Sequence, residues 1–212
     1  MGYPILPQKK AMHNNRNYIV FLCLLLLLSS CVSRKVFSTK YYYENEQTLT
    51  GIEQSFKTLY AQKPFSLGFS DLSFNYISIE IITDSIKYIY EFQINEPRFQ
   101  DTLHKYNLPA EGITNLVNQM RSIHCLWINN LDFYTNNQKR SLVFMSIHPV
   151  AIHIPFAPEK YYILTFYSQP QYFDSEGRLL ERRRLKKLRK INDEVFRRIN
   201  DKVCYTISER FR

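Results

Sequence analysis

The chain has 212 residues, of which 45% are hydrophobic and 15% aromatic, and it carries a formal net charge of +9. This apolar content is enough for a buried core and excludes a chain that is disordered throughout. Only five glycines occur, which leaves little material for glycine-rich phosphate-binding loops. The length suits one ordinary domain preceded by a leader.

The first 30 residues have the layout of a secretory signal. Residues 1–17 contain three Lys/Arg and no acidic residue, and residues 18–28 form an unbroken apolar run that ends at two serines. A basic segment, an apolar segment of about 7–15 residues and small residues before a cleavage point are typical of signal peptides. A membrane-spanning helix needs about 20 apolar residues. A start at Met12 instead of Met1 would shorten the basic segment, and both starts stay open.

The end of this leader, Leu28-Ser29-Ser30-Cys31, resembles the lipobox of bacterial lipoproteins. The resemblance implies that the Cys31 thiol receives a diacylglycerol, that the chain is cut before Cys31, and that fatty acid such as palmitate anchors the product. We therefore expect a signal peptide at 1–30, a lipidated tether at 31–43 and a single domain at 44–212. The expected location is a membrane of the bacterial cell envelope, either inner or outer. A plain signal or short anchor that happens to contain Cys31 is the alternative.

Two cysteines remain after processing, because Cys23 is cut away and Cys31 carries lipid. A disulfide between Cys125 and Cys204 is one interpretation, since an even pair in an oxidising envelope is compatible with it. Two buried free thiols are the other.

The elements follow in chain order. An amphipathic helix is expected over 44–63, with apolar side chains three and four residues apart. Period-two patterns over 76–83 and 86–94 around Asp84-Ser85 predict a β-hairpin. Short helices are expected over 99–106 and 111–123, and strands over 125–134, 140–148 and 160–168.

The last elements are a helix over 178–203 and a closing edge strand over 204–211. At 100° per residue, the apolar side chains of 178–203 fall within one arc, and residues 174–176 offer capping oxygens. The predicted fold class is therefore α+β, with a mainly antiparallel sheet of about five to six strands, flanking helices and a long basic amphipathic C-terminal helix.

The C-terminal segment is strongly basic. Residues 178–212 hold 13 Lys/Arg against 5 Asp/Glu. We predict a cationic face for an anionic lipid or an acidic protein; a solvated face without a partner is the alternative. Nucleic acid is not expected in this compartment. The predicted face comprises Arg182, Arg183, Lys186, Lys187, Arg189, Lys190 and Arg197.

The sequence contains no HExxH, GxSxG, GxxxxGK[ST] or CxxC pattern, and we expect no metal, no cofactor and no catalytic residue. The expected role is binding or structural, as an accessory protein. The alternative is a membrane-tethered hydrolase whose active site is assembled from residues far apart in the sequence, with His148 and His153 beside Asp132 or Glu159. The run Tyr41–Tyr43 is expected at the level of the lipid headgroups.

Overall fold

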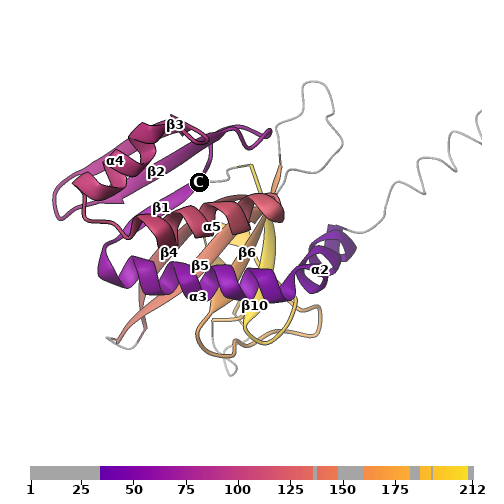
Figure 1. The fold of residues 1–212 in the computed structure, drawn as a ribbon. Helices are drawn as coiled ribbons and strands as arrows, with labels where there is room; N and C mark the ends of the chain where they lie inside the picture. Colours follow the sequence, from indigo (N-terminus) through magenta and orange to yellow (C-terminus); the bar gives the residue numbers. More distant parts are fainter. Residues whose placement is uncertain (1–33, 136–137, 148–159, 182–186, 192, 210–212) are drawn as a thin grey trace, which may run out of the picture. The chain divides into compact units, whose positions relative to one another are not determined.

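The computed structural model describes residues 34–135, 138–147, 160–181, 187–191 and 193–209 (Figure 1). The chain divides into two compact units, residues 1–40 and 41–212. Helix α2 (Arg34–Glu44) begins in the first unit and ends in the second. Within the described ranges, no helix is long and apolar enough to cross a membrane.

The second unit is built on a large antiparallel sheet, which confirms the predicted α+β class. Its described strands lie in the order β3-β2-β1-β4-β5-β6-β10-β9, and every neighbouring pair is antiparallel. These eight strands exceed the five to six that the sequence predicts. Their bounds are β1 Phe65–Phe69, β2 Tyr76–Ile82, β3 Lys87–Gln93, β4 Cys125–Thr135, β5 Gln138–Ile147, β6 Tyr161–Tyr167, β9 Arg197–Arg198 and β10 Val203–Ser208.

The chain crosses over the sheet between β3 and β4. Strands β1, β2 and β3 follow one another as a meander, and helices α4 (Pro97–Lys105) and α5 (Ala110–Ser122) then carry the chain back to the other side of β1. Strand β4 pairs there through Leu67 with Ile128 and Gly68 with Trp127. A Cβ atom on Gly68 would lie 2.1 Å from the Leu126 carbonyl oxygen, so the close approach of these strands requires glycine.

Helices cover one face of this sheet. Helix α3 (Glu46–Gln62) and helix α5 lie side by side across the strands, and α4 lies over the β2–β3 end (Figure 1). The buried side chains of both long helices are those that the helical spacing predicts, and burying each such aliphatic or aromatic side chain contributes about 1.5–3 kcal/mol. They are Leu49, Ile52, Phe56 and Leu59 from α3, and Ile113, Leu116, Val117 and Met120 from α5.

The opposite face of the sheet carries a second, smaller core at the β10 end. Leu142, Tyr167 and Cys204 point to this face from β5, β6 and β10, and the C-terminal segment covers them with Leu179 and Phe196. The segment also forms a small ladder of β7 (Lys190–Ile191) with β8 (Glu194–Val195).

The predicted C-terminal helix over 178–203 is wrong. The described residues of this range form strands, bridges and turns and no helix. Their backbone groups bond to distant partners: Leu179 N–H donates to the Phe196 carbonyl and Arg198 N–H to the Gly177 carbonyl.

Asp174, one of the three residues expected to cap that helix, closes a turn. The Asp174 carboxylate accepts hydrogen bonds from the backbone N–H groups of Glu176 and Arg178. An aspartate that bonds its own local backbone favours a turn over a helix. Burial works to raise the pKa of Asp174, but the hydrogen bonds and charge of Arg178 outweigh it and hold that pKa below its usual value.

Candidate functional site

The predicted lipidation site, Cys31, lies outside the described residues. The described residues begin at Arg34, and residues 34–43 of the expected tether belong to helix α2. The Tyr41 hydroxyl donates a 2.6 Å hydrogen bond to the Ile123 carbonyl, and burial raises the pKa of Tyr41. The second compact unit, residues 41–212, thus includes the last three residues of the expected tether.

Tyr42 also belongs to the domain. Its side chain is 4% exposed, and its hydroxyl donates to Glu46 Oε1 and accepts a bond from Asn200 Nδ2, each at 3.1 Å. Burial raises its pKa to about 12. The expectation that the whole run 41–43 lies at the headgroup level is wrong for Tyr41 and Tyr42, since both are used in packing.

Four of the seven predicted basic-face residues are described, and the structure does not place them on one helix face. Lys187 forms a 3.3 Å ion pair with Glu181, whereas Lys190 and Arg197 lie exposed on β7 and β9. The Arg189 guanidinium lies over the Tyr167 ring at 5.6 Å. Arg182, Arg183 and Lys186 lie outside the described residues.

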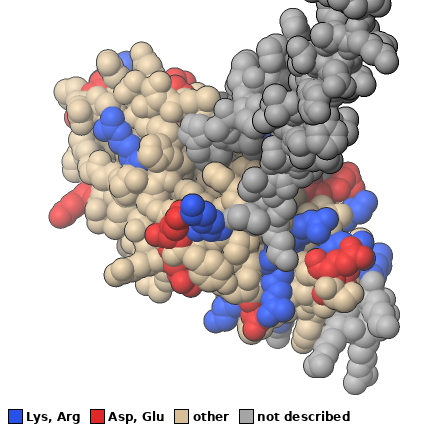
Figure 2. All heavy atoms as spheres, turned by 90° about the vertical axis from the view of Figure 1, so that its right-hand side faces the viewer, with Lys and Arg blue, Asp and Glu red and all other residues tan. Residues whose placement is uncertain are grey.

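Acidic side chains are interspersed among these cations. Arg178 pairs with Asp174 and Glu176, and Arg198 pairs with Asp201 at 2.6 Å. Figure 2 shows blue and red side chains next to one another on the face that it presents. The described part of the C-terminal segment is thus a mixed surface with a cationic excess.

The two cysteines are free and buried. Cys125 lies on β4 and Cys204 on β10, with β5 and β6 between them in the sheet. Strands lie about 4.8 Å apart, which puts the two thiols well beyond the reach of a disulfide. Burial raises the pKa of each thiol to about 12. In this structure the two cysteines are buried free thiols.

The residues considered for metal binding or hydrolysis are not brought together within the described ranges. His124 packs edge-on against Phe74, with ring centres 5.3 Å apart, and His104 lies on α4. Asp132 lies exposed on β4, and His148, His153 and Glu159 are not described. Among the described residues, no group of three or more His, Cys, Asp or Glu side chains has the arrangement of a metal site.

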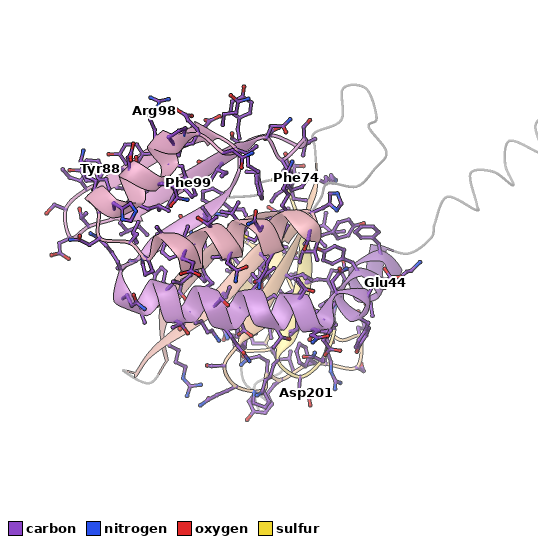
Figure 3. All side chains as sticks on the ribbon, in the orientation of Figure 1. Glu44, Phe74, Tyr88, Arg98, Phe99 and Asp201 are labelled. Atoms are coloured by element: carbon purple, nitrogen blue, oxygen red, sulfur yellow. The ribbon has the colours of Figure 1, made fainter. Side chains whose placement is uncertain are left out.

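The surface that the sequence analysis missed is the edge of the sheet formed by β3. Ile89 is 61% exposed, Tyr88 is 37% exposed, and Ile86 of the hairpin turn is exposed beside them, whereas exposed Tyr76 lies on β2 towards the other end of the hairpin. Tyr88 lies at the outer end of the domain, next to α4 (Figure 3). Large apolar side chains gathered on one edge are a typical feature of interaction surfaces.

The helix-facing side of β3 is an ordered row of aromatic rings. Tyr88, Tyr90 and Phe92 stack along the strand, and Phe92 contacts Phe99 of α4. The Tyr90 and Tyr106 hydroxyls lie 2.6 Å apart, and this hydrogen bond raises the pKa of Tyr106 to about 12. The row is joined to α4 through the contact of Phe92 with Phe99.

No family model, curated protein or solved structure matches the chain. The function that follows is therefore argued from the chain's own residues.

Proposed function

We propose that this chain is a lipid-anchored lipoprotein of the bacterial cell envelope. The observation that carries the proposal is the complete lipobox Leu28-Ser29-Ser30-Cys31 at the end of a basic-then-apolar leader. Small residues give a peptidase access to the cleavage point, and only cysteine offers a nucleophilic sulfur for the lipid. Each acyl methylene that enters the bilayer contributes about 0.8 kcal/mol, so two or three chains hold the protein stably.

The arrangement of the chain supports this proposal. The second compact unit begins at Tyr41, ten residues after the expected attachment point. The expected attachment point therefore precedes this unit in the chain. Tyr41 and Tyr42 fix the first residues of that unit to its body through Ile123 and Asn200.

The proposed role of the domain is binding or structural, as an accessory protein, and not catalysis. The exposed apolar edge at β3 supports a binding role. The cationic excess of residues 178–212 supports an anionic partner, either lipid headgroups or an acidic protein. Inner and outer membrane both remain compatible with the proposal.

Metabolic labelling tests the anchor. Cells that express the full chain are supplied with radiolabelled palmitate, and the label is expected on the chain and in the membrane fraction. The Cys31→Ser variant is expected to carry no label, whereas Cys23→Ser, which changes the other leader cysteine, is expected to label normally. Label on Cys31→Ser, or its loss in Cys23→Ser alone, contradicts the proposal.

A further inference from the structure

Strand β3 is an outermost strand of the sheet, and the charges on either side of its residue Ile89 are complementary. The opposite edge of the sheet is short: the outermost strand there, β9, has two residues and pairs with β10, and the Thr206 hydroxyl of β10 donates to the Val195 carbonyl. Strand β3 pairs with β2 through all seven of its residues, and no described strand lies on its other side. An open edge presents backbone donors and acceptors to any strand that approaches.

The ladder shows which backbone groups point outward. Thr83 N–H donates to the Ile86 carbonyl, and Ile94 N–H donates to the Asn75 carbonyl. Alternate residues of an antiparallel strand turn both backbone groups to the same neighbour, so the even-numbered residues of β3 bond to β2. Lys87, Ile89 and Glu91 consequently direct their N–H and C=O groups to the free edge.

The side chains of the same three residues share one face. Side chains alternate along a strand, and Lys87, Ile89 and Glu91 lie on the face opposite to the Tyr88–Tyr90–Phe92 row. Exposed Ile89 is thus flanked at equal distances by a cation and an anion. Lys87 Nζ lies 2.8 Å from Glu80 Oε2, and its side chain is 51% exposed. Glu91 accepts a bond from the Ser70 hydroxyl.

We propose that β3 is a dimerisation edge: it pairs antiparallel with β3 of a second copy of this chain, centred on Ile89. A two-fold axis through Ile89 places it opposite Ile89 of the partner subunit, and it places Lys87 opposite Glu91 of the partner subunit. All three facing pairs have outward backbone groups and exchange two hydrogen bonds each. On the other face, Tyr88 lies opposite Tyr90 of the partner subunit, and such aromatic cross-strand pairs are favourable.

Charge complementarity favours this register and favours a second copy of the chain as the partner. A shift of two residues sets a charged side chain opposite Ile89, and a shift of four sets Lys87 opposite its own copy or Glu91 opposite its own copy. Like charges directly opposite are destabilising. Closed two-fold pairing of a self-complementary patch is the commonest form of protein assembly. The result is one continuous sheet across two subunits.

Charge reversal with rescue tests the proposal. The full chain is co-expressed with two different affinity tags, solubilised in a non-ionic detergent and captured through the first tag, and the second tag is measured. We expect co-capture of the wild-type chains. Glu91→Lys in both copies sets cations opposite Lys87, and Lys87→Glu in both copies sets anions opposite Glu91; each is expected to lower co-capture at least about tenfold.

The decisive experiment co-expresses the two charge-reversal variants. A Glu91→Lys copy with a Lys87→Glu copy restores opposite charges at both contacts, and we expect co-capture near the wild-type level. Glu209→Lys in both copies, with the same charge change beyond the end of β10, is the matched control and is expected to behave as wild type. Wild-type chains that are not captured together, a single reversal without effect, or a mixed pair without rescue each overturn the proposal.

A cross-link on the wild-type chain does not depend on any variant folding. A zero-length carbodiimide joins a lysine to a carboxylate in direct contact. In a mixture of ¹⁴N and ¹⁵N chains, we expect a link from Lys87 to Glu91 of the partner subunit between isotopically different peptides. The ion pair of Lys87 with Glu80 within one chain is the internal positive control. Formation of the control link alone overturns the proposed register.

Discussion

The hydroxyl of Tyr41 donates a hydrogen bond to the backbone carbonyl of Ile123, 82 positions further along the chain. The bond attaches the end of α2 to the residue that terminates α5. It therefore joins the first residues of the folded unit to the point where the chain turns from the helical layer into β4.

Removal of this hydroxyl should destabilise the fold. Tyr41→Phe leaves the Ile123 carbonyl without its donor, and a buried acceptor that loses its partner costs about 1–3 kcal/mol. Urea unfolding of residues 34–212 measures the free energy of unfolding. Tyr43→Phe is the matched control, because Tyr43 is 55% exposed. Equal effects of the two changes would show that the Tyr41 bond does not stabilise the domain.

Two glycines offer a sharp contrast. Gly68→Ala is expected to destabilise the fold by about 3 kcal/mol or more, because its Cβ would lie 2.1 Å from the Leu126 carbonyl oxygen and 2.4 Å from the Trp127 ring. Gly51→Ala, in the middle of α3 with no atom within 4 Å of the added methyl group, should stabilise by about 0.5–1 kcal/mol. Thermal unfolding of both variants checks the opposite signs.

The buried thiols predict a loss of stability at alkaline pH. Burial raises the pKa of Cys125 and Cys204 from 9.0 to about 12. Between these values the unfolded chain releases thiol protons that the folded chain keeps. The stabilisation is complete below pH 9 and decreases as the pH rises towards 12, with a slope approaching about 1.4 kcal/mol per pH unit for each thiol.

Urea unfolding at intervals from pH 8 to 10.5 measures this slope. Cys125→Val keeps the volume and removes the titrating group, so its slope should be shallower than that of the wild-type chain. An unchanged slope in this variant would show that the Cys125 thiol does not contribute.

Exposed cations of the C-terminal segment should contribute to binding of anionic lipid. Reversal of Lys190 and Arg197 to Glu is expected to weaken binding of unacylated residues 34–212 to phosphatidylglycerol vesicles by at least about fivefold per site. Sedimentation with vesicles measures the bound fraction. Arg121→Glu, an exposed cation at the end of α5, is the matched control. Equal binding by the double variant and wild type would contradict a lipid-facing role.

The sequence predicts the regular elements well where one face is buried. The helices that contain Ile52 and Leu116 and the hairpin that contains Tyr90 are amphipathic, so their period is visible in the residues. Strand β1 is not predicted, because all five of its residues are buried and a strand buried on both faces has no alternation.

The remaining errors come from non-local pairing. The apolar arc of residues 178–203 satisfies a helical wheel, yet Leu179 and Phe196 bond to each other through their backbones and cover the sheet. The exposure of Ile89 depends on strand order, because β4 joins the sheet beside β1 and leaves β3 outermost. Neither fact is encoded in a local pattern.

One edge of β1 is covered only by a later part of the chain. Strand β1 precedes β2 and β4 in the chain and pairs with both. The three-stranded meander that ends at Gln93 has two unpaired edges until β4, which begins at Cys125, pairs with β1 and covers one of them. A nascent chain halted between these points would expose the edge of β1 at Leu67 and Gly68, where unpaired backbone groups can pair with other strands.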